Sequence, residues 1–150
     1  MLARTHLAFG FLTAMIAKNM IPVGNVYIFF GLVLFGALLP DIDSPNSIIA
    51  KKLFLLKPFT IFTKHRGILH SLIGTLALSG IVFFLISKTY GFALFLGYFS
   101  HLLIDGLTLE GINFLHPVSK LHLSGFVETG KWLEHVILIG LVLIILLKLF

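Results

Sequence analysis

Five apolar runs, each close to the length of a membrane-spanning helix, dominate this 150-residue sequence. They cover residues 3–20, 23–40, 67–87, 91–109 and 132–149. A helix that crosses the roughly 30 Å hydrocarbon core of a bilayer needs about 20 mostly apolar residues. The sequence therefore predicts an all-α, polytopic membrane protein, a bundle of about five transmembrane or re-entrant helices in a single domain, residues 1–150.

The first run is the weakest of the five, because its most apolar stretch, residues 7–17, is as short as a signal-peptide core and follows the basic Arg4. A signal peptide has a positive start and an apolar core of this length, but no A-x-A cleavage site follows, and Lys18 comes directly after the run. We expect the segment to be retained, and a shallow interfacial helix is the alternative to a full span.

The composition supports a membrane location and excludes several other classes. Apolar residues make up 58% of the chain and charged residues 11%, and the mean hydropathy is +1.07. So many large apolar residues exclude a disordered chain, and the absence of cysteine excludes a disulfide framework. The net charge of +5 indicates loop topology and contact with anionic lipid, and no nucleic-acid partner is expected.

The basic residues are distributed unequally between the two faces that five alternating spans would create. Eight fall on one face: Arg4, Lys51, Lys52, Lys57, Lys64, Arg66, Lys120 and Lys131. Three fall on the other: Lys18, Lys88 and Lys148. Because cytoplasmic loops are enriched in lysine and arginine, this bias predicts a cytoplasmic-membrane protein with a cytoplasmic N-terminus and an external C-terminus. An anionic substrate could also explain basic residues on one face.

Seven histidines and aspartates within or beside the first four runs all fall at the ends on this basic side. They are His6, Asp41, Asp43, His65, His70, His101 and Asp105. Each ionisable residue costs on the order of 2.5–3.5 kcal/mol near the centre of a membrane helix, so their placement is informative. Four antiparallel spans would bring all seven to one depth near one membrane face.

Imidazole and carboxylate groups are together the ligand set of zinc and similar divalent ions. His101 and Asp105 are four residues apart, which places both on one helix face. Asp41 and Asp43 form a D-x-D after Pro40, and an extended loop would point both the same way. We expect His65 in the loop before the third helix and His70 in the first turn or two of that helix.

These motifs resemble the YdjM-like membrane-bound metal-dependent hydrolases. The resemblance rests on LPDIDSP at residues 39–45, HRGILHS at 65–71 and GYFSHLLID at 97–105, with support from Thr5-His6 and from GINFLHP at 111–117. That family is distantly similar to zinc-dependent phospholipases C and related single-strand nucleases, which use a His, Asp, His, H-x-x-x-D order of ligands. The chain lacks the later H-x-x-x-E pair of those enzymes, so the resemblance implies one or two metal ions and not three.

The leading hypothesis is metal-assisted hydrolysis of a lipid or lipid-linked phosphate at the cytoplasmic interface. Asp43 is the candidate bridging carboxylate, Asp41 a ligand or general base, and Arg66, with Lys64, the candidate phosphate contact. The predicted metal ligands are His6, Asp41, Asp43, His65, His70, His101 and Asp105, with zinc the first choice of ion. The alternatives are a divalent-ion transporter and a non-catalytic protein whose metal only joins helices.

Overall fold

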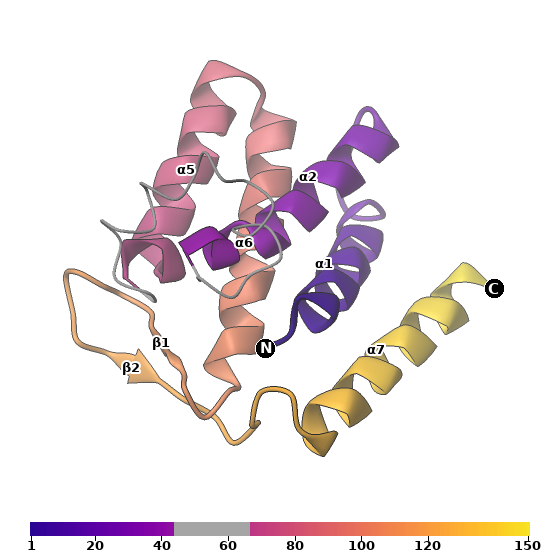
Figure 1. Ribbon diagram of the computed structural model, residues 1–150. Helices are drawn as coiled ribbons and strands as arrows, with labels where there is room; N and C mark the ends of the chain where they lie inside the picture. Colours follow the sequence, from indigo (N-terminus) through magenta and orange to yellow (C-terminus); the bar gives the residue numbers. More distant parts are fainter. Residues whose placement is uncertain (44–66) are drawn as a thin grey trace.

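The computed structural model describes residues 1–43 and 67–150. Within them, five α-helices occupy the five predicted runs, so the prediction of a helical chain is confirmed (Figure 1). These helices are α1 (Ala3–Ala17), α2 (Val26–Leu38), α5 (Leu72–Leu85), α6 (Lys88–Gly106) and α7 (Trp132–Leu149). Short 3₁₀ helices, η1 (Pro40–Asp43) and η3 (Ile68–His70), follow α2 and precede α5.

Most of these helices are shorter than the runs that predicted them. Only α7, among the described helices, is both long and apolar enough to cross a membrane by length and composition, whereas α2 and α5 have 13 and 14 residues. At 1.5 Å per residue those two span about 20 Å, well below the hydrocarbon thickness. A crossing by each of the five helices therefore stays a prediction.

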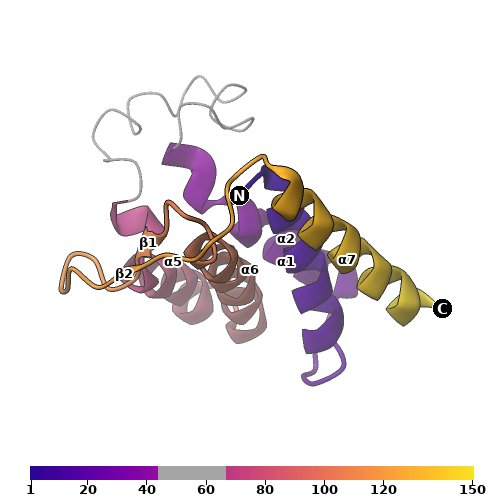
Figure 2. The same cartoon turned by 90° about the horizontal axis from the view of Figure 1, so that it is seen from below.

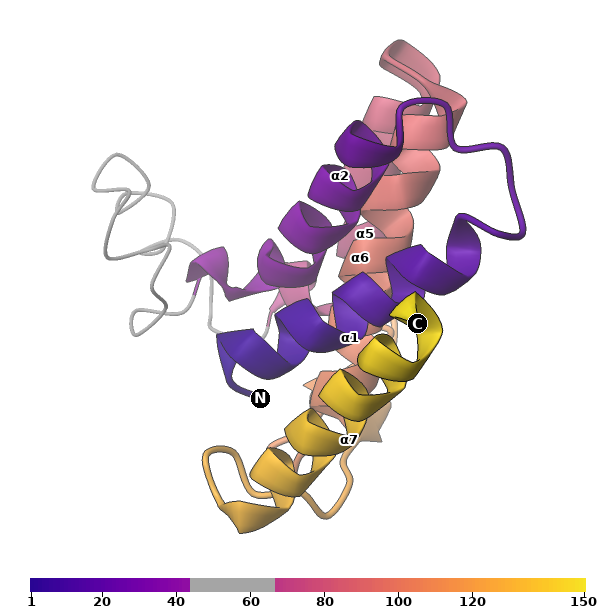
Figure 3. The same ribbon diagram turned by 90° about the vertical axis from the view of Figure 1, so that its right-hand side faces the viewer.

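α6 lies at the centre of the bundle and packs against α1, α2 and α5 (Figure 1). α7 packs against α1 (Figure 3), and its C-terminal half extends away from α6 (Figure 1). The N-terminus, the end of α2 with η1, and the start of α7 lie at one end of the molecule (Figure 2). This arrangement brings the polar helix ends together, as the sequence predicts.

Two glycines allow the close approach of α2 and α6. A Cβ atom on Gly97 would lie 1.9 Å from the carbonyl oxygen of Val33, and one on Gly36 would lie 2.6 Å from that of Leu94. Both positions therefore exclude a side chain, as expected for small residues at a helix crossing. Gly31 of α2, by contrast, has no atom within 4 Å of the position that a Cβ would take, so it takes no part in this crossing.

The third apolar run is interrupted, which corrects one sequence prediction. Ser71 is extended (φ −129°, ψ 158°), and its hydroxyl accepts a hydrogen bond from the Gly74 N–H at 3.2 Å, so it is the N-cap of α5. His70 consequently lies in η3, before α5, and not within the first turns of that helix.

The chain between α6 and α7 contains a small hairpin that the all-α prediction did not include. Strands β1 (Ile112–Asn113) and β2 (His122–Leu123) pair antiparallel, with Ile112 opposite Leu123. Gly111 starts the hairpin with φ +59°, a left-handed conformation that glycine adopts without steric cost. The N–H of Leu72 donates to the carbonyl of Phe114 at 2.9 Å, which ties the hairpin to the start of α5.

Candidate metal centre

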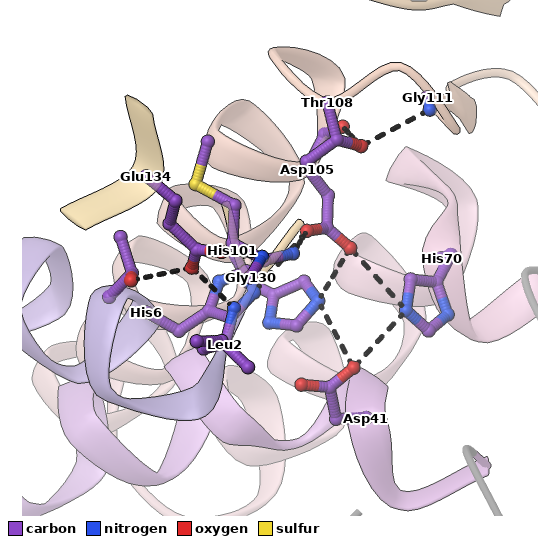
Figure 4. A network of polar contacts seen from close by, with 12 residues as sticks. Leu2, His6, Asp41, His70, His101, Asp105, Thr108, Gly111, Gly130 and Glu134 are labelled. Carbon is purple, nitrogen blue, oxygen red and sulfur yellow. Dashed lines mark hydrogen bonds and ion pairs between the residues drawn. The ribbon is translucent and has the colours of Figure 1, made fainter. Parts of the chain in front are cut away.

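Three imidazoles and two carboxylates meet where α1, η1, η3 and α6 come together (Figure 4). The side chains of His6, His70, His101 and Asp105 are almost fully buried, at 0–4% exposure, whereas that of Asp41 is 21% exposed. They form two overlapping groups whose donor atoms lie within 4.8 Å of one another: His6, Asp41 and His101, and His70, His101 and Asp105. Four separate segments of the chain therefore contribute to one cluster.

Asp105 lies close to all three imidazoles. Its Oδ1 atom is 3.3 Å from His6 Nε2, and its Oδ2 atom is 3.4 Å from His101 Nε2 and 4.0 Å from His70 Nε2. The α-amino group of Met1 lies 2.5 Å from Oδ1, so the carboxylate already faces a cation. The helical spacing of His101 and Asp105 thus places both groups toward a common point, as the sequence predicts.

Asp41 closes the cluster on its more exposed side. Its Oδ1 atom lies 3.8 Å from His70 Nε2 and 3.9 Å from His101 Nε2. Burial raises the pKa of the Asp41 carboxyl, but its interactions with the neighbouring imidazoles, the hydrogen bond to His70 first among them, together outweigh burial and hold the pKa below the ordinary 3.8. The group is therefore an ionised carboxylate, which a cation requires.

The tautomer of His101 is set by a backbone group. Its Nδ1–H donates to the carbonyl of Ala37 at 2.8 Å, so the lone pair of the neutral ring lies on Nε2 and is directed at both carboxylates. The ring of His6 stacks on that of His101, with centroids 3.8 Å apart and planes 10° apart. Tyr98 supports the third imidazole, because its hydroxyl donates to the carbonyl of Leu69 at 2.6 Å, beside His70.

The donor set fits a divalent ion in spacing, charge and hydrogen bonding. Zinc bonds of 2.0–2.1 Å place tetrahedral donors about 3.4 Å apart, close to the 3.3–4.0 Å separations here. The two carboxylates supply negative charge to the site, one of them beside the Met1 α-amino group, so the cluster as a whole attracts a cation. Among the described residues, His6 Nδ1 and Nε2 and His101 Nε2 are buried without a hydrogen-bond partner, which costs about 1–3 kcal/mol per group unless a ligand binds there.

The structure corrects the geometry that the sequence suggests for the D-x-D motif. Asp41 and Asp43 lie in the 3₁₀ helix η1, so the backbone of the motif is not extended. The side chain of Asp43, together with the whole of His65 and Arg66, lies outside the described part of the chain. Their predicted roles as ligands or phosphate contacts stay predictions.

His101 Nε2 belongs to both donor groups, and one nitrogen lone pair binds one ion. The two groups therefore overlap at His101 and are not two independent sites. A second ion would need further donors, for which Asp43 and His65 are the sequence candidates. The more distant candidates Glu110, His116, His122, Glu128 and His135 belong to neither group in the described residues.

Sequence reasoning missed Glu134, which is buried beside the cluster at 1% exposure. Its Oε1 atom accepts from the Leu2 N–H at 2.6 Å and from the Thr5 hydroxyl at 2.7 Å, and its Oε2 atom accepts from the Gly130 N–H at 2.6 Å. Its position in the first turn of an apolar helix is the signal that could have identified it.

The fold and the site together define a helical protein with a buried His/Asp cluster at one end of its bundle. The model of the YdjM inner membrane protein family matches residues 1–149, so this chain belongs to that family. The family description supports an inner-membrane location, and the description itself states no activity. No solved structure matches the chain significantly.

Two curated relatives have the name inner membrane protein YdjM, from Escherichia coli (strain K12) and Shigella flexneri. The chain is 33% identical to each over 129 residues, a match that covers 78% of this chain and 66% of each relative, just under two thirds of their length. The uncharacterised protein YvsG of Bacillus subtilis (strain 168) is 36% identical over 115 residues, with 72% and 69% covered.

Proposed function

We propose that this chain is a metal-dependent hydrolase of the inner membrane that cleaves a phosphoester in a lipid or lipid-linked phosphate. The observation that carries the proposal is the buried cluster of His6, Asp41, His70, His101 and Asp105, whose spacing fits a divalent ion. The proposed orientation, from the distribution of basic residues, has the N-terminus and this cluster on the cytoplasmic side.

The number and exposure of the donors favour a catalytic ion over a structural one. A structural zinc ion is enclosed by four protein ligands, whereas a catalytic ion keeps a position for water or substrate. Five donors converge here, and Asp41 is 21% exposed whereas Asp105 is 4% exposed. Asp41 thus lies where a substrate could approach, and Asp105 lies in the enclosed part.

A bound divalent ion would lower the pKa of a water molecule and neutralise charge on a phosphoryl group. In this proposal the protein supplies the orientation and the proton acceptor. The carbonyl of Ala37 orients the His101 ring and fixes a proton on Nδ1, and Asp105 supplies buried negative charge. Asp41 accepts the proton of the attacking water, and Arg66 and Lys64 contact the phosphate, as inferred from the sequence alone.

A lipid substrate is supported by an apolar cavity of about 360 Å³ between α1 and α6. Phe9, Leu96 and Phe92 are among its lining residues, and its volume is within the range of small-ligand pockets. Phe9 lies one helical turn beyond His6 on α1. A phosphate at the metal cluster would therefore place an attached acyl or prenyl chain within reach of this cavity.

The transporter hypothesis predicts ionisable groups at intermediate depth or at both ends of the bundle. In the described residues the donors gather at one end, where α1 and η3 begin and α2 and α6 finish. A purely structural metal predicts a closed shell and no turnover. Zinc flux into proteoliposomes and hydrolysis by the purified protein therefore separate the three functions.

The test uses protein purified in detergent, loaded with zinc, and two substrates that share one phosphoester headgroup. One substrate has long acyl chains and the other has short, water-soluble chains. We expect hydrolysis of the long-chain substrate by the wild type and none by His101→Ala. Leu96→Trp, which fills the cavity, should lower turnover of the long-chain substrate and retain that of the short-chain one. Zinc-loaded wild type that cleaves neither substrate nor other lipid phosphates would contradict the proposal.

A further inference from the structure

Glu134 is the buried carboxylate of α7 that belongs to neither donor group of the metal cluster. Its three hydrogen bonds go to two different helix starts: Leu2 and Thr5 at the beginning of α1, and Gly130 just before α7. Figure 4 shows its side chain between these segments, on the side of the cluster where His6 lies. One side chain therefore joins the N-terminal ends of α1 and α7.

Both helices lack a side-chain cap of their own. Leu2 and Lys131 are the N-cap residues of α1 and α7, and neither makes a side-chain capping bond. The first N–H groups of a helix have no partner inside the helix, and negative charge there is favourable. Glu134 supplies this function to α1 from a separate helix, because it accepts the N–H of the N-cap residue Leu2. Its bond to Gly130 fixes the residue before the N-cap of α7.

Within the metal cluster, His6 is the residue that depends most on the position of α1. Neither ring nitrogen of His6 has a hydrogen-bond partner among the described residues, whereas His101 is held by its own bond to Ala37. The position of the His6 ring is therefore set by the placement of α1, by stacking on His101 and by the 3.3 Å contact of Nε2 with Asp105. Thr5, the residue before His6, donates its hydroxyl proton to Glu134.

We propose that Glu134 is a positioning residue that caps α1 from α7 and thereby holds His6 in the metal cluster. The inference rests on the proposed metal site, but its contacts are independent of any ion. Glu134 acts through α1 and belongs to neither donor group.

The first test measures zinc affinity by competition with a chromophoric chelator. Outer partners of metal ligands typically contribute about 10–100-fold in affinity, so Glu134→Ala should weaken zinc binding at least tenfold. Glu134→Gln keeps one carbonyl acceptor for the α1 contacts and should recover part of that loss. The control is Glu128→Gln. Glu128 is 61% exposed, and in the described part of the chain its ion pair is with Lys131, which is also exposed. Its zinc affinity should equal that of the wild type.

A double-mutant cycle separates positioning from general destabilisation. In a His6→Ala background, Glu134→Gln should leave the remaining zinc affinity unchanged, because the group through which Glu134 acts is gone. An equal loss of affinity with and without His6 would overturn the inference.

A second measurement needs no metal and so distinguishes this inference from the proposed function. In metal-free protein in micelles, Glu134→Gln should shift the Cε1–H NMR resonance of His6, which stacks on His101, and leave that of His122 unchanged. An unchanged His6 resonance would refute the positioning role. If the wild type binds no zinc but Glu134→Gln still shifts the His6 resonance, the metal site is refuted and the positioning role is retained.

Discussion

Gly97→Ala is the substitution whose effect can be worked out most fully from the structure. A Cβ at residue 97 would lie 1.9 Å from the Val33 carbonyl oxygen, whereas ordinary contact begins at 3.4 Å. The difference, 3.4 − 1.9, requires α2 and α6 to separate locally by about 1.5 Å. Overpacking of this kind typically costs about 1–3 kcal/mol of stability.

The same displacement acts on the metal cluster. His101 lies one helical turn after Gly97 on α6, and Ala37 lies one turn after Val33 on α2. A full shift of about 1.5 Å would lengthen their 2.8 Å hydrogen bond beyond the limit of such a bond. Because that bond orients His101, we expect zinc affinity to fall by about 10–100-fold.

The assay compares zinc dissociation constants and thermal midpoints of wild type, Gly97→Ala and Gly31→Ala in one detergent. Gly31 is the matched control, because it lies in α2 with no atom within 4 Å of a Cβ position. Alanine is the better helix former by about 1 kcal/mol, so Gly31→Ala should be neutral or slightly stabilising. Wild-type zinc affinity in a folded Gly97→Ala variant would refute the link between helix approach and ligand geometry.

Three further outcomes are expected. His101→Ala should abolish bound zinc in elemental analysis, whereas His122→Ala, an exposed residue that contacts Asn113, should retain it; equal zinc content in both would contradict the assignment. Tyr98→Phe should lower the free energy of unfolding by about 1 kcal/mol and weaken zinc binding, because the Tyr98 hydroxyl holds the backbone beside His70. Tyr27 is 89% exposed, so Tyr27→Phe should change neither quantity. Removal of metal by a chelator should lower the thermal midpoint, and added zinc should restore it, since a ligand that binds the folded state stabilises it. A thermal midpoint that neither treatment changes would contradict a metal site in the folded protein.

The helices and the convergence of their polar ends could be predicted from the sequence because both depend on local pattern. Long apolar runs with His6, Asp41, His101 and Asp105 at alternating ends require antiparallel helices to bring those groups together. The i, i+4 pair of His101 and Asp105 is fixed by helix geometry alone.

Other features depend on tertiary contacts that periodicity does not contain. The capping hydroxyl of Ser71 interrupts the third run, so His70 lies in η3. The tautomer of His101 depends on a carbonyl of α2 that lies 64 residues away in the chain. The role of Glu134 depends on the meeting of α1 and α7, which share no sequence motif.

The most direct test of the central claim is anomalous scattering from crystals of the purified protein, recorded at the zinc absorption edge. The account predicts a peak among His6, Asp41, His70, His101 and Asp105, about 2.0–2.2 Å from nitrogen and oxygen ligands. Zinc-replete protein with no peak there, or with zinc bound only at another position, would contradict it.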